Sequence, residues 1–205
     1  MPIIIPTSEF VQGSDKWMDA KLGIPSSSHF GEILTSTGKE SATRPKYLKK
    51  LVNERITRRR EKKWELSAFE RGKEMEPESR AWAENILDVE IEQVALVYKD
   101  EYKRILCSPD GLIGDNGGFE TKDANVYIQA ERLAKGVLPT IHYAQVQGCL
   151  YITEREYWIF QSYCAGMRKL TIRVHRDEKW IKKLAIELEL FCEELDEEVD
   201  RLKKA

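Results

Sequence analysis

The sequence lacks long hydrophobic runs, and this absence limits where the protein can reside. Its apolar runs are short, as in Ile3–Ile5, whereas a membrane-spanning helix needs about 20 predominantly apolar residues. No positively charged segment followed by a long apolar stretch opens the chain, so no secretory signal is visible. We therefore expect a cytoplasmic protein with no membrane partner.

Clustered cysteines are also absent. The four cysteines are scattered and form no C-x-x-C pair: Cys107, Cys149, Cys164 and Cys192. This spacing excludes a disulfide framework, a zinc knuckle and an iron–sulfur cradle, and it indicates reduced thiols.

The sequence also has no large excess of positive or negative residues. Lys and Arg number 33 against 35 Asp and Glu, giving a formal charge of −2. This excludes a bulk polycation but leaves room for a local basic patch. Residues 44–63 hold ten Lys or Arg and two acids, and residues 187–200 hold eight acids and no base. The acidic run is typical of a solvated helix face, and the basic run fits either such a face or a nucleic-acid contact.

What is present is the profile of a globular domain. The chain has 205 residues, 41% hydrophobic and 33% charged, with no internal repeat and no linker, so we predict one domain over residues 1–205. The spacing of apolar residues predicts helices near 15–23, 29–34, 45–56, 69–86, 125–135 and 140–152, with a long C-terminal helix within 176–205. Alternating β-branched and aromatic residues predict strands near 89–98, 104–107, 157–163 and 170–174. The fold class is therefore α/β, with a mixed central β-sheet flanked by α-helices.

Three ionisable residues surround a glycine-rich turn in the middle of the chain. Asp110 ends one short strand, the segment 114–118 predicts a tight turn, and Glu120 and Lys122 follow two residues apart. Side chains at that spacing in a strand face the same side. Two carboxylates suit Mg²⁺, and a lysine beside the ion has its charged form disfavoured and can orient or deprotonate a water. A cross-strand salt bridge is the structural alternative for the same residues.

The same residues bear a resemblance to a known group of enzymes. Ser108 to Leu112 (SPDGL) followed by Phe119 to Lys122 (FETK) resembles the P-D…(D/E)-x-K signature of the nucleases with a restriction-endonuclease-like core. Within that superfamily the chain is similar to the YqaJ-type viral recombinases, the lambda-exonuclease family. Three further elements in the family's order extend the resemblance over residues 17–151: WMDAKLGIPSSS at 17–28, RGKEME at 71–76 and YAQVQGCLY at 143–151.

The resemblance implies roles for individual residues around the metal. Asp110 and Glu120 would ligate the metal with the backbone carbonyl of Thr121, and Lys122 would position or activate the attacking water. Glu76 would join the same cluster, and Gln147 would orient groups around the nucleophile. The cofactor would be two Mg²⁺ ions per site, with Mn²⁺ as a substitute.

A second set of residues is implied to bind DNA. Lys21, Ser28 and Ser108 match positions that hold a terminal 5′-phosphate, and Tyr151 is grouped with them. The family is expected to have Arg at the first of these positions, and a lysine keeps the charge but loses bidentate phosphate geometry. Ser28 within a helix cap, and Gln147 with Tyr151 as a buried hydrogen-bonding pair, are the structural alternatives.

The resemblance also implies an activity and partners. It implies a Mg²⁺-dependent 5′-to-3′ exonuclease on linear double-stranded DNA ends that leaves 3′ single-stranded overhangs. Further implications are a trimeric ring, a single-strand annealing protein as partner, and a phage or prophage origin in a bacterial host. Two rivals stay open: an endonuclease of the same superfamily, and a DNA-end-binding scaffold protein without catalysis.

Overall fold

The computed structural model describes the backbone outside residues 61–65 and the side chains outside residues 61–74. The predicted order of elements is recovered, with an additional strand at the N-terminus that the sequence patterns did not predict. The elements are β1 Ile3–Pro6, α1 Asp15–Ala20, the 3₁₀ helix η1 Ser27–Glu32, α2 Arg44–Thr57, α3 Leu66–Leu87, β2 Val94–Tyr98, β3 Leu106–Cys107, β4 Gly111–Ile113, β5 Gly117–Asp123, α4 Val126–Lys135, α5 Thr140–Thr153, β6 Tyr157–Tyr163, β7 Leu170–His175 and α6 Glu178–Lys203.

The strands form two hydrogen-bonded groups. The first is antiparallel with the order β1-β2-β3, and the second has the order β4-β5-β6-β7. In the second group β5 and β6 run parallel while the other pairs are antiparallel, so the predicted mixed α/β architecture is confirmed. The chain leaves the first group after Cys107 and enters the second at Gly111, and Pro109 between them has no N–H to extend a ladder.

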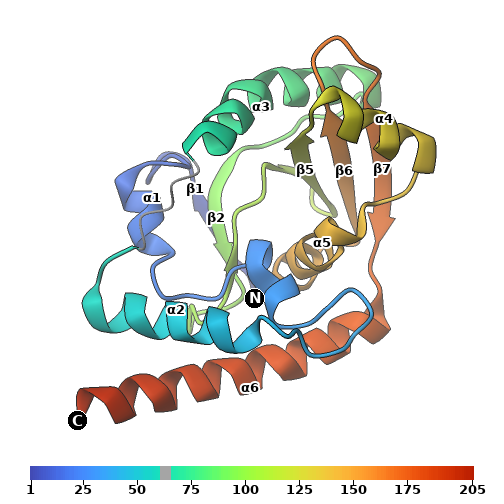
Figure 1. Cartoon of the computed structure of the whole chain (residues 1–205). Helices are drawn as coiled ribbons and strands as arrows, with labels where there is room; N and C mark the ends of the chain where they lie inside the picture. Colours follow the sequence, from blue (N-terminus) through green and yellow to red (C-terminus); the bar gives the residue numbers. More distant parts are fainter. Residues whose placement is uncertain (61–65) are drawn as a thin grey trace.

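The predicted turn joins β4 and β5 in a hairpin. Gly111 pairs with Phe119 and Ile113 with Gly117, so the chain reverses through residues 114–116. The parallel partner β6 follows after α4 and α5, and Figure 1 shows β5, β6 and β7 side by side with α5 crossing near the middle of the molecule. Parallel pairing of β5 to β6 aligns Glu120 with Phe160 and Lys122 with Ser162.

The core lies between the strands and the helices around them. Phe30, Trp158, Phe160 and Phe191 are fully buried within one apolar cluster, which also includes the stripe of α6. Helix α5 approaches η1 closely at Gly148, where an added Cβ would lie 2.5 Å from the Phe30 ring. This close approach fixes the segment that contains Ser28 against the helix beside the sheet.

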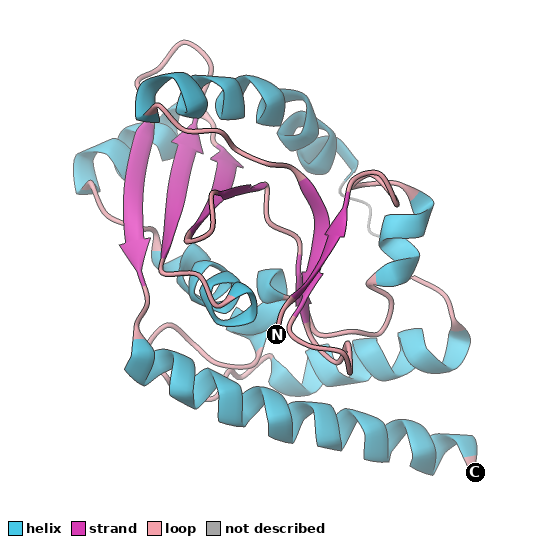
Figure 2. Ribbon diagram, turned by 180° about the vertical axis from the view of Figure 1, so that it is seen from behind, coloured by secondary structure: helices cyan, strands magenta, loops and turns pink. Residues whose placement is uncertain are grey.

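The long C-terminal helix packs along α2, and both ribbon views show the two helices running next to each other (Figures 1 and 2). Arg44 Nη1 donates to Glu194 Oε2 at 2.5 Å, and Arg55 pairs with Asp196, which also accepts from Arg104 Nη2 at 2.8 Å. The basic and acidic runs of the sequence are thus partly paired with each other. The last residues of the basic run, 61–63, lie outside the described residues.

Three local features refine the sequence predictions. Pro77 lies inside α3, and the helix continues on both sides of it. The segment after Ser26 is a 3₁₀ helix, and Ser26 makes no side-chain cap hydrogen bond to it. Among the described residues, none of the helices has the length and apolar character needed to cross a bilayer.

Candidate active site

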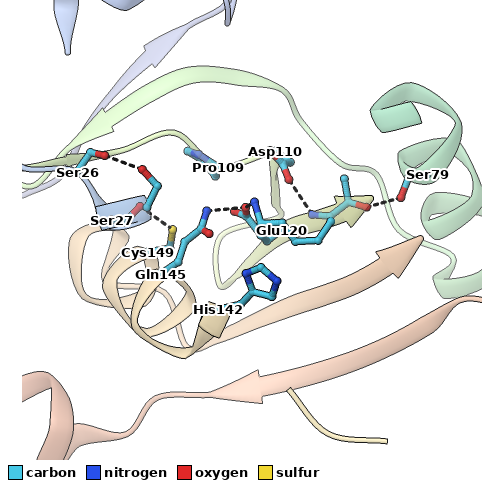
Figure 3. Close-up of polar contacts among 12 residues, drawn as sticks. Ser26, Ser27, Ser79, Pro109, Asp110, Glu120, His142, Gln145 and Cys149 are labelled. Carbon is cyan, nitrogen blue, oxygen red and sulfur yellow. Dashed lines mark hydrogen bonds and ion pairs between the residues drawn. The ribbon is translucent and has the colours of Figure 1, made fainter. Parts of the chain in front are cut away.

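A large cleft of about 1500 Å³ opens where β5, α3, α1 and η1 meet. Ten residues were singled out from the sequence, and eight of them line it: Lys21, Ser28, Glu76, Ser108, Asp110, Glu120, Thr121 and Lys122. These residues come from five separate stretches of the chain. The fold therefore brings distant motifs into one site, and Figure 3 shows the part of it around Asp110, Glu120 and Gln145.

Glu120 is the most buried of the ionisable residues at this site, with 1% of its surface exposed. Its Oε1 accepts a hydrogen bond from Lys122 Nζ, as the two-residue spacing in a strand predicts, and a second from Gln145 Nε2 at 2.6 Å (Figure 3). Its other oxygen, Oε2, is buried and has no hydrogen-bond partner in the structure. A buried charged oxygen without a partner is costly, so this atom is suited to a cation ligand.

Asp110 lies opposite β5 on the short link between β3 and β4. Its Oδ2 accepts a hydrogen bond from the backbone N–H of Thr121 at 2.7 Å (Figure 3). This bond holds the carboxylate beside the strand that carries Glu120 and Lys122. The predicted grouping of two carboxylates and one ammonium is therefore present in the structure.

Glu76 reaches the same cleft from α3. Its Oε1 accepts from Arg80 Nη1 at 3.3 Å, and the same Arg80 nitrogen donates to the backbone carbonyl of Asp110 at 3.1 Å. Arg80 was not singled out from the sequence, because nothing in its local pattern shows that a helix residue contacts the β3–β4 link.

The carboxyl groups have raised pKa values because they are buried close together. Burial and the charge of Asp110 raise the pKa of Glu120 to about 7, against the opposing effect of Lys122. Burial and Asp110 also raise the pKa of Glu76 to about 7, and Arg80 opposes this shift. For Asp110 burial raises the pKa, while Lys122 and the Thr121 N–H act against it.

Lys122 is held as an ammonium in this arrangement. Burial alone lowers its pKa, but the charges of Glu120 and Asp110 and the hydrogen bond to Glu120 outweigh burial, and the pKa lies above its ordinary value. The sequence reasoning expected the charged form to be disfavoured beside a metal ion. With the carboxylates as its neighbours, the lysine carries a positive charge, and the effect of a metal ion on it stays a prediction.

Lys21, Ser28 and Ser108 line another part of the cleft. Trp17 Nε1 donates to Ser108 Oγ at 3.0 Å, and Lys21 Nζ lies 3.8 Å from the centre of the Trp17 ring. Ser28 Oγ lies 2.9 Å from Ser26 Oγ. Burial lowers the pKa of Lys21 to about 8, against the opposing effect of Cys107 and Glu120, and nearby lysines lower it further. A partly buried cation with two hydroxyl groups is a chemically suitable site for a phosphate.

The placement predicted for Gln147 is wrong. Its side chain is buried at the junction of β7 and α6, where Nε2 donates to the His175 carbonyl at 2.8 Å and Oε1 accepts from the Asp177 N–H at 2.9 Å. Gln145 lies in the cleft instead. Two residues along a helix differ in direction by about 200°, so only one of the two glutamines can face Glu120.

Tyr151 is also placed away from the cleft. Its half-buried ring packs against the core, and Lys99 Nζ lies 4.9 Å from its centre. Burial raises the pKa of its hydroxyl. The Q-x-x-x-Y spacing puts Tyr151 near the face of Gln147 rather than that of Gln145, so both residues are turned from the site together.

The donor set of the site fits Mg²⁺. Asp110 and Glu120 offer carboxylate oxygens, and Glu120 Oε2 is a buried oxygen with no other partner. No three His, Cys, Asp or Glu side chains in the described part of the chain are arranged to hold a metal by themselves. Mg²⁺ is commonly bound by one or two carboxylates while it retains several waters, so two carboxylates are sufficient for this ion.

Comparison with known families identifies the family of the chain. The family profile described as the YqaJ-like viral recombinase domain matches residues 16–156, which include all four sequence elements. The chain belongs to the YqaJ-like viral recombinase family. Among curated proteins, no sequence matches the chain significantly.

Solved structures share the fold. An alkaline exonuclease (LHK-Exo) from Laribacter hongkongensis matches with a TM-score of 0.85 and 27% identity, over 93% of this chain and 97% of that one. The same exonuclease in complex with dAMP matches with a TM-score of 0.84 and 28% identity, over the same shares of the two chains. A phage-related exonuclease from Haemophilus somnus 129PT shares the fold, with a TM-score of 0.67 and 12% identity over 87% of this chain and 96% of that one.

Proposed function

We propose that this YqaJ-family chain is a Mg²⁺-dependent exonuclease that degrades the 5′-ended strand of linear double-stranded DNA. The observation that supports it best is the cleft in which Glu120 Oε2 is buried without a partner, next to Asp110 and Lys122. The similarity to LHK-Exo over most of both chains supports nuclease chemistry. LHK-Exo has been solved with dAMP, the type of mononucleotide that stepwise DNA hydrolysis releases.

The residues of the cleft have distinct parts in this reaction. Asp110, Glu120 and the Thr121 carbonyl would hold Mg²⁺, with Glu76 close by. A bound Mg²⁺ supplies Lewis-acid polarisation of the scissile phosphate. Gln145 fixes Glu120, and the Lys122 ammonium orients the water and offsets negative charge as it develops on the phosphate.

The cationic part of the cleft would hold the DNA end. Lys21 supplies a charge, and Ser28 and Ser108 supply hydroxyl groups for a terminal 5′-phosphate. Binding of the 5′ end beside the carboxylates would select the 5′-ended strand for hydrolysis. Two metal ions per site, a trimeric ring and a single-strand annealing protein as partner belong to the same proposal, as implications of the family.

The test uses a linear duplex with one 5′-phosphorylated end and the other end blocked. Each strand is labelled separately and followed with Mg²⁺, with chelator and with Lys122→Ala. We expect stepwise loss of the 5′-phosphorylated strand, abolished by chelator and by Lys122→Ala. Lys135→Ala is the matched control, because Lys135 lies on an exposed face of α4 and pairs with Glu131.

Other outcomes distinguish the rival functions. Cleavage of a closed circular duplex would indicate an endonuclease, because a circle has no end. Binding of the duplex without strand loss in Mg²⁺ or Mn²⁺ would indicate an end-binding scaffold, and the Asp110–Glu120–Lys122 set would then be a salt-bridged hairpin.

A further inference from the structure

Helix α3 delivers Glu76 to the cleft, although the residue next to Glu76 is a proline within the helix. Pro77 lies inside the helix and has no N–H to donate to the preceding turn. A helix weakened at this point depends on contacts beyond the proline to keep Glu76 at a fixed height over the sheet. Ser79 and Arg80, within one turn of the proline, make polar contacts of this kind.

Ser79 joins α3 to the sheet through a buried polar network. It is fully buried, and its Oγ lies 2.5 Å from Thr121 Oγ1 on β5 (Figure 3). Gln161 on β6, also fully buried, donates from Nε2 to the Ser79 carbonyl at 2.8 Å and to Ser79 Oγ at 2.7 Å. Gln161 Oε1 in turn accepts from Thr171 Oγ1 on β7 at 3.3 Å. Buried networks of this kind define one arrangement because every broken bond leaves a group unpaired.

Arg80 connects the same turn of α3 to the β3–β4 link, which contains Asp110. It is 9% exposed, and its Nη1 contacts both Glu76 Oε1 and the carbonyl of Asp110. One guanidinium therefore links a carboxylate on the helix to the backbone beside a second carboxylate. Thr121, whose carbonyl is expected to ligate the metal, is bound by Ser79 from the other side.

We propose that Ser79 and Arg80, supported by Gln161, are positioning residues for the metal site. Together they hold Glu76, Asp110 and Thr121 in one geometry and so set the affinity of the site for a divalent cation. None of the three is expected to touch the reacting phosphate. This inference rests on the proposed function, since it assumes that the carboxylate cluster binds a metal.

The test measures Mn²⁺ binding to the full chain directly, by electron paramagnetic resonance of free Mn²⁺. Ser79→Ala removes one hydroxyl and leaves the bond from Gln161 to the Ser79 carbonyl. Arg80→Lys keeps the charge but removes the planar guanidinium whose Nη1 contacts both Glu76 and the Asp110 carbonyl. We expect each substitution to raise the Mn²⁺ dissociation constant about tenfold, as removal of residues that orient metal ligands does. Half-saturating Mg²⁺ in the nuclease assay should rise in parallel, while affinity for a DNA end in chelator stays unchanged.

Ser162→Ala is the matched control. Ser162 is the next residue on β6, equally buried, and its Oγ bonds to Gln129 and Arg132 rather than to α3. We expect it to lower the melting temperature about as much as Ser79→Ala and to leave Mn²⁺ binding unchanged.

The outcomes separate this inference from the proposed function. The positioning role would be overturned if Ser79→Ala and Arg80→Lys bound Mn²⁺ with wild-type affinity. It would also be overturned if Ser162→Ala lost as much Mn²⁺ affinity as these two variants. The wild-type chain could bind Mn²⁺ but cleave no DNA, while both variants bind Mn²⁺ more weakly. That outcome would support the positioning role and reject the proposed nuclease activity. A wild-type chain that binds no Mn²⁺ at all would overturn both.

Discussion

Two of the regions where acidic and basic side chains meet in this molecule differ in their surroundings. Along the α2–α6 contact, Glu194 and Asp196 pair with arginines while about half of each acidic side chain remains exposed. At the cleft, Glu120 is 1% exposed, shares one oxygen between Lys122 and Gln145, and has a second oxygen with no partner. Solvated pairs of the first kind stabilise a fold weakly, whereas a buried, incompletely satisfied cluster is typical of a binding site.

The largest effect is expected on activity at the cleft. Asp110→Asn keeps an oxygen that can accept from the Thr121 N–H but removes the charge. We predict a fall in the hydrolysis rate of about 100- to 1,000-fold, the range for loss of one preorganised electrostatic group. The measurement is mononucleotide release from linear duplex DNA in Mg²⁺, with thermal unfolding followed in parallel. If the variant kept more than a tenth of the wild-type rate, Asp110 would not be part of the catalytic site.

The two glutamines of α5 should separate activity from stability. Gln145→Ala removes a bond to Glu120 and should reduce the rate about tenfold with little change in unfolding. Gln147→Ala leaves the His175 carbonyl and the Asp177 N–H unpaired and should cost about 1–3 kcal/mol of stability. Chemical denaturation and rate measurements on both variants check this. A loss of rate in Gln147→Ala with a loss of stability in Gln145→Ala would indicate that Gln147 acts in the site.

The raised pKa values predict how stability depends on pH. Glu76 and Glu120 have pKa values of about 7 in the folded chain, against an ordinary value of 4.5. Between these values the folded state binds more protons than the unfolded state, so the contribution of these residues to stability falls as pH rises from about 4.5 to 7. In the metal-free protein, stability should therefore decline over this window relative to the Glu76→Gln, Glu120→Gln double variant. A wild-type chain that gains stability relative to that variant as pH rises would contradict the burial argument.

The smallest effect is expected at the α2–α6 contact. Glu194→Ala removes a half-exposed partner of Arg44 and should cost no more than about 1 kcal/mol, with a smaller cost at high salt. Denaturant unfolding at two salt concentrations measures this. A cost of several kcal/mol would show that the two regions do not differ as described.

The hairpin that carries Glu120 and Lys122 could be predicted from the sequence, because the patterns that specify it lie within a few residues of one another. A glycine-rich turn predicts the hairpin, and the two-residue period puts Glu120 and Lys122 on one side, as the structure has them. The role of Gln147 was implied by the family resemblance alone. Local patterns could not correct it, since α5 is buried on most of its surface and has no polar stripe to show which glutamine faces the sheet. The Q-x-Q pattern contains both residues and does not distinguish them.

Other parts of the site depend on contacts between distant segments. Arg80 contacts Asp110 across 30 residues, and Gln161 contacts Ser79 across 82. Nothing in the residues adjacent to Arg80 or Gln161 indicates these partners. The charge runs were visible in the sequence, but their mutual pairing along α2 and α6 depends on the packing of two helices whose paired residues lie 141 to 150 positions apart.

The most direct test of the account compares Glu120→Gln with Glu194→Gln, the same chemical change in the two regions. The measurement is the Mg²⁺-dependent release of nucleotides from linear duplex DNA, with melting temperatures as a check of folding. We predict that Glu120→Gln abolishes release while it remains folded, and that Glu194→Gln releases nucleotides at the wild-type rate. A folded Glu120→Gln variant that still degrades the duplex would contradict the assignment of the buried carboxylate cluster as the nuclease centre.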